Sequence, residues 1–323
     1  MLLLVLEGGG MRAGFVAGSV MGLMDKLLTG FDKAVAVSAS VPTLAYFAAG
    51  QREDLEKVWR HELNTPKLVC YKNIPAASLA PSVKRPVLNI DYLVYNVFKE
   101  KFPLNLDAVL ANPMACHFAV TTVPDGRLKF LRPGVGDIYR VFMACLAVPG
   151  CYPDAVSFGD NDYVDGGTAH PLPVQAMLTH SSDRVVAILS KPTDCESDPP
   201  TLLERTLFWR YFKKYDWMMD KLCEAAHAYR EEVSFLEALT RQRPPRAYII
   251  SPERMPPVKF ISRDRTKINR TIDLGYKTVE AAENQLRHFI AGSVNVNNSN
   301  NGTDQAQRCR FAMPDLNREG LWT

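Results

Sequence analysis

Residues 2–14 read LLLVLEGGGMRAG, and this stretch decides the fold. Its first five residues are apolar without interruption, which is typical of a strand that is buried on both faces of a parallel sheet. Three glycines then indicate a turn, and apolar residues recur at helical spacing from Val16 to Leu27 before Gly30 ends the helix. The sequence therefore predicts a strand, a glycine-rich turn and a helix.

The same pattern follows directly along the chain. A second apolar strand over residues 34–37 ends at Ser38, and a further helix is predicted to start after Pro42. Residues 117–123, 184–189 and 247–250 are later strand candidates. Strands that alternate with helices in this way predict a wound α/β sheet.

The first predicted helix carries Gly14, Gly18 and Gly22 at intervals of four residues. Residues four apart lie on one helix face, so these glycines form a stripe without side chains. Because glycine lowers helix stability, the stripe predicts that another backbone packs closely against this face.

Composition excludes several classes of protein. The 323 residues carry 38 basic and 35 acidic side chains, a balance that does not favour a nucleic-acid partner. Seven scattered cysteines without a C-x-x-C pair argue against a disulfide framework or a thiolate metal site. The apolar run that ends at Glu7 is too short for a signal peptide or a membrane span, so we expect a cytoplasmic protein.

The glycine-rich turn over residues 8–14 allows three interpretations. It fits a loose dinucleotide-binding pattern, but the next strand ends at Ser38 where that motif needs an acidic residue. A phosphate-binding P-loop requires lysine where this chain has Phe15. In the third interpretation, successive backbone amides at a helix N-terminus form a cradle for an oxyanion.

Ser38 lies where a strand turns sharply into a helix, with the small residues Ala36 and Ser40 on either side. A nucleophile elbow needs small residues at these positions, because larger side chains would collide with the flanking strand and helix. Such a serine is more often a simple helix cap. The oxyanion cradle in the preceding strand-turn-helix unit favours the nucleophile.

A serine nucleophile needs a base, and none of the six histidines stands in a recognisable triad setting. Asp165 is a better candidate, because it follows an apolar strand and precedes Gly166 and Gly167. Glycines at these positions allow close approach of another backbone. The sequence thus offers a serine and an aspartate that are informative only together.

Four motifs in fixed order resemble the patatin-like phospholipase family, most closely its bacterial members. They are EGGGMR at residues 7–12, VSA at 37–39, AVPG at 147–150 and VDGG at 164–167. The resemblance implies a three-layer α/β/α fold with a mostly parallel central sheet. It implies one domain over residues 1–291, followed by a polar, asparagine-rich tail over residues 292–323.

The resemblance also implies the chemistry. Enzymes of this family are serine acyl hydrolases that use a serine-aspartate dyad without histidine, metal or cofactor. On this chain the implied site comprises Ser38 as nucleophile, Asp165 as base, the amides of Gly9, Gly10 and Met11 as oxyanion donors, and Gly8 and Arg12 as loop support or head-group contacts.

The implied substrates are phospholipids, lysophospholipids or other acyl esters, with peripheral contact at a membrane. Residues 207–219 mix aromatic, methionine and basic side chains, a pattern typical of either a lipid-facing segment or a cap helix. Oligomeric state is not predicted.

Two alternatives stay open. Ala13, Ala36 and Ser40 depart from the usual family motifs, which is compatible with a lipid-binding pseudoenzyme on the same fold. The dinucleotide pattern is compatible with an oxidoreductase, although that alternative leaves Ser38 and Asp165 without roles.

Overall fold

The computed structural model describes residues 1–75, 85–123, 125–195, 215 and 217–292. Most of the segment 207–219 and the tail from residue 293 onward lie outside the described residues. The predicted lipid-facing or cap segment and the predicted polar tail therefore lie largely outside the described residues.

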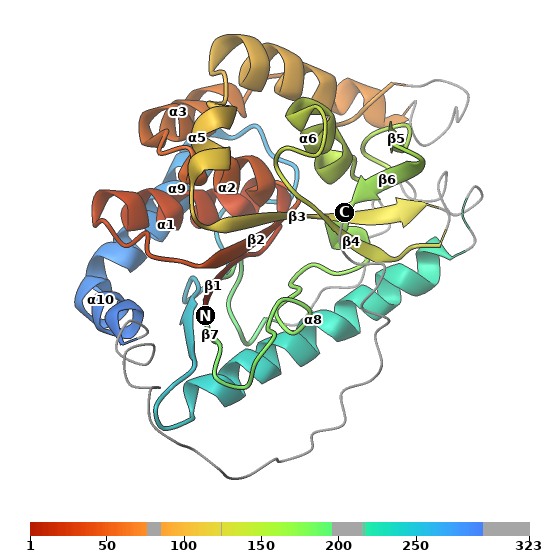
Figure 1. Cartoon of the computed structure of the whole chain (residues 1–323). Coiled ribbons are helices and arrows are strands. Elements are labelled where there is room, and N and C mark those ends of the chain that lie inside the picture. The colour runs from red at the N-terminus through yellow and green to blue at the C-terminus, as the bar shows by residue number, and fades with distance from the viewer. Residues whose placement is uncertain (76–84, 124, 196–214, 216, 293–323) are drawn as a thin grey trace.

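An eight-stranded sheet forms the centre of the described part of the chain (Figure 1). Its strands are β1 (Leu2–Leu6), β2 (Lys33–Val37), β3 (Ala115–Val123), β4 (Leu128–Leu131), β5 (Val156–Phe158), β6 (Asn161–Asp165), β7 (Arg184–Ile188) and β8 (Ala247–Ile250). The order is β5-β6-β3-β2-β1-β7-β8, and β4 also pairs with β3. Strands β3, β2, β1, β7 and β8 are parallel, whereas β4, β5 and β6 pair antiparallel.

Helices cover both faces of this sheet. They are α1 (Gly14–Asp25), α2 (Ser40–Ala48), α3 (Arg52–Lys57), α5 (Leu106–Ala111), α6 (Ile138–Leu146), α8 (Met218–Thr240), α9 (Arg265–Ala281) and α10 (Glu283–Ala291). Helix α8 lies below the sheet in Figure 1, and α1, α2 and α9 lie on the opposite side. The predicted three-layer fold with a mostly parallel sheet is confirmed.

The alternation within β1 explains why its sequence is apolar throughout. Leu2, Leu4 and Leu6 belong to the core on the α1 side, and Leu3 and Val5 belong to the core on the α8 side. All five are at most 1% exposed. Because successive side chains point to opposite faces, a strand between two helical layers has no polar face.

The glycine stripe of α1 packs against α9. A Cβ atom on Gly18 would lie 1.9 Å from the carbonyl oxygen of Ile272, and one on Gly275 would lie 2.0 Å from that of Phe15. The two backbones approach too closely for any side chain at either glycine. The predicted close backbone contact is confirmed, and it holds α1 in place directly behind the glycine-rich turn.

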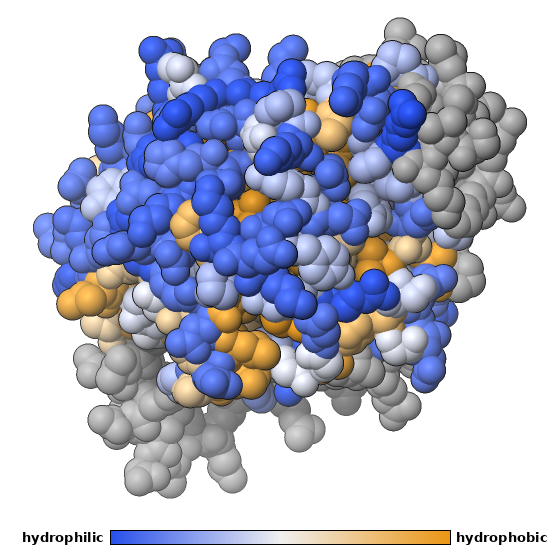
Figure 2. All heavy atoms as spheres, turned by 90° about the horizontal axis from the view of Figure 1, so that it is seen from above, coloured by the Kyte–Doolittle hydropathy of each residue, from blue (hydrophilic) through white to orange (hydrophobic). Residues whose placement is uncertain are grey.

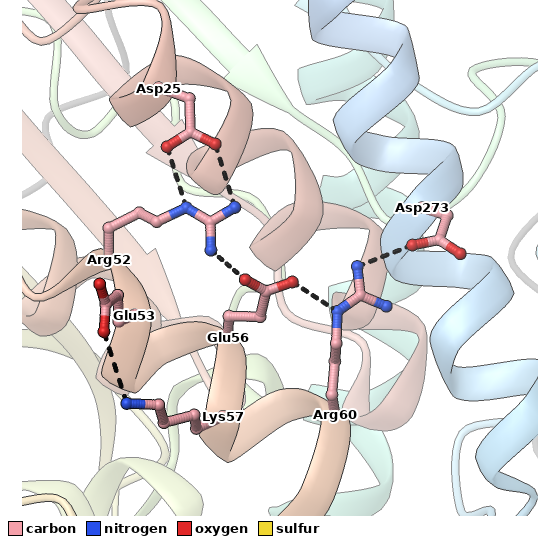
Figure 3. A network of polar contacts seen from close by, with 7 residues as sticks. All are labelled: Asp25, Arg52, Glu53, Glu56, Lys57, Arg60 and Asp273. Atoms are coloured by element: carbon pink, nitrogen blue, oxygen red, sulfur yellow. Dashed lines mark hydrogen bonds and ion pairs between the residues drawn. The ribbon is translucent and has the colours of Figure 1, made fainter.

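A chain of ion pairs fastens the outer helices together (Figure 3). Arg52 of α3 donates to both carboxylate oxygens of Asp25 at 2.9 and 3.0 Å. Glu56 then bonds Arg52 and Arg60, and Arg60 reaches Asp273 of α9 at 2.7 Å. This network, defined by these five residues, joins α1, α3, the π-helix Val58–Glu62 and α9.

The start of one helix and the presence of two strands differ from the sequence-based prediction. Helix α2 begins at Ser40, so Pro42 lies inside its first turn, where a missing amide hydrogen breaks no helical bond. The strands β4 and β5 were not predicted, because each is short. Strand β4 pairs with β3, and β5 pairs with β6, whose last residue is Asp165.

The surface seen from above Figure 1 is mostly hydrophilic, with hydrophobic side chains gathered in small separate patches (Figure 2). Within the described residues, no helix combines the length and apolar character that crossing a membrane requires.

Candidate active site

The register of β3 brings Ser38 and Asp165 together. Val37, the last residue of β2, pairs with Ala119, and Asp165, the last residue of β6, pairs with Val120. Strand β4 pairs with β3 across the same positions, so it occupies the other edge. Strands β2 and β6 therefore meet end to end along one edge of β3. Ser38 follows β2 directly and so lies beside Asp165.

Ser38 adopts a strained backbone conformation, with φ at 55°. Leu27 is the other non-glycine residue with a positive φ in the described part of the chain. This region costs an L-residue about 1–2 kcal/mol, and such strain is typical of functional turns. The side chain is 6% exposed and lines a pocket. This geometry is that of a nucleophile elbow.

The residues that flank the elbow fit it. Ala36 is fully buried within β2. The hydroxyl of Ser40, also fully buried, donates to the carbonyl oxygen of Glu7 at 2.6 Å. Ser40 therefore ties the elbow to the start of the glycine-rich turn, a role that sequence reasoning did not assign to it.

Asp165 is 3% exposed, and its Oδ1 accepts the amide of Gly167 at 2.8 Å. Burial raises the pKa of Asp165 to about 6, against a lowering by the Ser38 hydroxyl and the Gly167 amide. Its Oδ2 is buried and has no fully formed hydrogen bond within the described residues. The Ser38 hydroxyl is nonetheless close enough to the carboxyl to lower its pKa, and catalytic contacts of this kind often tighten only when substrate binds.

A carboxyl with this pKa suits a general base. It is ionised at pH 7, and it holds a proton more strongly than an exposed aspartate does. Among the described residues no histidine lines the pocket, and Asp165 is a carboxyl whose pKa the Ser38 hydroxyl lowers.

The glycine-rich turn needs its glycines for space as well as for conformation. Gly10 has φ at 56°, and a Cβ there would lie 2.4 Å from the carbonyl oxygen of Phe260. A Cβ on Gly8 would lie 3.0 Å from the Cβ of Ser38. The turn therefore lies directly against the elbow, as the sequence predicted.

Two of the three expected oxyanion donors are available. No acceptor in the described part of the chain takes the amide of Gly9 or Gly10. The amide of Met11, in contrast, donates to the carbonyl oxygen of Phe260 at 2.9 Å. The amide of Met11 would reach a substrate oxygen only after Phe260 moved, so its role as an oxyanion donor stays a prediction.

Arg12 lies beside the turn rather than in the pocket lining. Its guanidinium is 6.0 Å from the centre of the Phe260 ring, and its Nε is buried without a hydrogen-bond partner among the described residues. This placement fits support of the loop. It brings no direct contact with the pocket.

The pocket beside Ser38 encloses a cavity of about 70 Å³. Ser38, Gly10 and Met11 line it, and the remaining lining is almost entirely apolar. Its side chains include Tyr46, Trp59, Leu63, Leu68, Leu93, Phe98 and Leu146. An apolar pocket that ends at a reactive group is typical of a site for an apolar chain that carries one reactive bond.

Sequence reasoning missed Ser190 and Phe260. Ser190 follows the predicted strand 184–189, and parallel strands present their carboxyl ends at one edge of a sheet. That rule could have placed Ser190 near the turn. Phe260 lies in an irregular segment, and no local pattern marks it. No group of three or more potential metal ligands occurs among the described residues.

Comparisons with known proteins point to one family. A family model described as patatin-like phospholipase matches residues 4–178. The uncharacterized protein YjjU of Escherichia coli strain K12 is 24% identical over 200 residues, which cover 61% of this chain and 54% of that protein. The chain thus spans about half the length of this curated relative.

A similar solved structure is VipD from Legionella pneumophila. It has a TM-score of 0.47 and 12% sequence identity, and the match covers 88% of this chain and 66% of that chain.

Proposed function

This chain belongs to the patatin-like phospholipase family, and we propose that it is a serine acyl hydrolase that cleaves carboxylic esters of phospholipids, lysophospholipids or related acyl lipids. One observation supports the proposal above all. A serine in a strained turn lies beside a buried aspartate and opens onto an apolar pocket.

In the first half of the proposed reaction, the Ser38 hydroxyl attacks the ester carbonyl carbon while Asp165 accepts its proton. The negative charge that develops on the carbonyl oxygen is stabilised by the amides of Gly9 and Gly10. The tetrahedral intermediate then collapses. The alcohol leaves with the proton from Asp165, and the acyl group stays on Ser38.

In the second half, a water molecule attacks the acyl-enzyme and Asp165 accepts the proton of that water. The same amides stabilise the second tetrahedral intermediate. When it collapses, the Ser38 oxygen takes the proton back and the carboxylic acid is released. One ester and one water thus yield one acid and one alcohol, and the enzyme is regenerated.

The pocket supports an acyl lipid over a polar substrate. An aliphatic chain buried against its leucines and aromatic rings would gain about 25 cal/mol per Å² of apolar area. A charged dinucleotide would find almost no polar partners along the same lining. This contrast favours the hydrolase over the oxidoreductase alternative.

Peripheral contact with a membrane at the cytoplasmic face is part of the proposal, because the substrates reside there. The apolar pocket supports this contact, whereas the face seen in Figure 2 is mostly hydrophilic. We therefore expect brief encounters in which one lipid is drawn out of the bilayer.

The test compares purified wild type with Ser38→Ala and Asp165→Asn, using a fluorophosphonate probe, p-nitrophenyl esters of increasing chain length and a panel of phospholipid classes. Ser157→Ala is a matched control, because this serine lies on the exposed edge strand β5. We expect wild type and control to be labelled and active, and the two site variants to be inactive.

Folded wild type that is neither labelled nor hydrolytic would establish the pseudoenzyme alternative instead. Full activity of Ser38→Ala would show that another residue is the nucleophile.

A further inference from the structure

The proposed reaction leaves one buried carboxyl next to the glycine-rich turn without a role. Glu7 is 4% exposed and follows β1 directly, but it does not line the pocket. Its Oε2 accepts the backbone amide of Ser190 at 2.6 Å. Burying a carboxylate costs free energy unless it is paired and hydrogen-bonded, so its retention beside the turn calls for an explanation.

Ser190 connects Glu7 to the turn itself. The Ser190 hydroxyl donates to the carbonyl oxygen of Gly8 at 2.9 Å. A Cβ on Gly9 would lie only 2.5 Å from the same hydroxyl oxygen, so the two residues are in direct contact. From the other side, Ser40 donates to the carbonyl oxygen of Glu7. Residues 7–9 are thus held between the end of β7 and the start of α2.

Two cations and one phenol interact with Glu7 from three neighbouring segments. Lys191 follows Ser190, Arg12 lies on the turn, and Tyr229 lies on α8. The ammonium group of Lys191 is 3.7 Å from the centre of the Tyr229 ring. Burial raises the pKa of Glu7 to about 7, against a lowering by Lys191, the Ser190 amide and Arg12. Glu7 therefore changes its protonation state near neutral pH.

We propose that Glu7 is a positioning residue whose carboxylate, acting through Ser190, aligns the amides of Gly9 and Gly10 with the oxygen of the scissile ester. This inference rests on the proposed acyl hydrolase function. In addition to Asp165, the rate then depends on the ionisation of a second group, Glu7.

The physical reason is the strength of a charge-assisted hydrogen bond. The carboxylate holds the Ser190 amide more strongly than a neutral acid does, and it is attracted by Lys191 and Arg12. Protonation removes that attraction and loosens the turn. A small displacement of oxyanion donors lowers kcat, whereas the apolar side chains that would bind the acyl chain stay in place and keep KM nearly unchanged.

The experiment measures kcat and KM against pH for wild type, Glu7→Gln and Ser190→Ala with a soluble short-chain ester. Glu232→Gln is the matched control, because Glu232 is a buried carboxyl, 3% exposed, that accepts the amide of Gln175 away from the turn. The wild-type acid limb should contain two ionisations, near pH 7 and near pH 6.

Glu7→Gln should lose the ionisation near pH 7, keep the one near pH 6, and lower the plateau kcat about tenfold to a hundredfold with little change in KM. Ser190→Ala should lower kcat less, because the backbone amide that Glu7 binds is still present. Glu232→Gln should retain the wild-type profile.

Unchanged kcat and pH dependence in Glu7→Gln would overturn the inference while the hydrolase proposal stands. If Glu7→Gln does not fold, the wild-type profile decides, and a single ionisation on its acid limb overturns the inference. A wild type that neither reacts with fluorophosphonate nor cleaves esters refutes the proposed function itself, a result that is distinct from both.

Discussion

The carboxyls of the candidate active site differ from those of the outer ion-pair network. Burial raises the pKa of Asp165 and Glu7 to about 6 and about 7. Partial burial also acts on Glu56, but the hydrogen bonds from Arg52 and Arg60 lower its pKa overall. The same functional group therefore has a pKa near neutral pH in one region and a lowered pKa in the other.

The difference lies in pairing and solvent. In the network each carboxylate meets a guanidinium at a partly exposed surface, so its charge is compensated (Figure 3). In the site, Asp165 meets a hydroxyl and an amide in a buried setting. Pairing favours rigidity of the helices, whereas incomplete pairing favours proton transfer. The predictions below test this division, from the largest expected effect to the smallest.

Ser38→Ala should lower kcat about 10⁴-fold or more, because it removes the proposed nucleophile. Steady-state hydrolysis of a p-nitrophenyl ester measures the effect. The corresponding substitution in the network, Glu56→Gln, should leave kcat unchanged. A large loss of activity in Glu56→Gln at intact fold would contradict the division between the two regions.

Gly10→Ala should lower kcat about 10²-fold, because a methyl group there collides with the Phe260 carbonyl and displaces the oxyanion donors. Gly50→Ala is the control, since Gly50 also has a positive φ but nothing within 4 Å of the added Cβ. The control should cost about 1 kcal/mol of stability and no activity. Equal activity losses in both variants would show that strain, not position, is responsible.

The value of kcat/KM should fall as the pH drops below about 6, and the fall should approach tenfold per pH unit, because protonated Asp165 cannot accept the serine proton. The rate falls towards low pH because a base must be ionised to act. Glu56, with its lowered pKa, stays charged over this range and adds nothing to the profile. A rate that is flat between pH 5 and pH 8 would exclude Asp165 as the base.

Asp165→Asn should abolish activity but raise the free energy of unfolding at pH 8, by at most about 3 kcal/mol. The folded pKa of about 6 exceeds the ordinary value of 3.8, so burial of the charge destabilises the folded state above pH 6. The gain should shrink as pH falls towards 3.8. Urea unfolding at several pH values measures it, and a less stable variant at pH 8 would refute the assignment.

Glu56→Gln should lower the free energy of unfolding by less than about 1 kcal/mol, because partly exposed ion pairs are screened by solvent. The pKa of the Glu56 carboxyl is lowered in the folded state. The stabilisation is therefore present above the ordinary pKa of glutamate and is lost as pH falls through the pKa of the folded state. Urea unfolding at low and high salt measures the effect. An effect that does not diminish with salt would show that packing, not charge, is involved.

Much of the site could be predicted from the sequence. The apolar run of β1, the three glycines and the small residues around Ser38 are each required by local backbone geometry, so they leave a local pattern. Asp165 could be proposed because an aspartate followed by two glycines at a strand end allows close approach. The glycine stripe of α1 predicted a close backbone contact for the same reason, and the structure shows that α9 makes it.

Other features could not be predicted. The Ser190 amide meets Glu7 across 183 residues of chain, and the Phe260 carbonyl meets Met11 from an irregular segment. Neither contact requires a particular residue type on the backbone side, so neither leaves a pattern. The carbonyl oxygen of Phe260 thus accepts the Met11 amide, which motif reasoning had assigned to the substrate oxygen.

The sequence by itself determined the order of strand, turn and helix and the identity of the reactive side chains, because steric limits on the backbone act over a few residues. Only the tertiary structure decided that β2 and β6 share one edge of β3, and that Asp165 and Glu7 lose water where Glu56 keeps it. Burial and register depend on the whole chain. They convert an ordinary serine and two ordinary carboxyls into a site suited to acyl transfer.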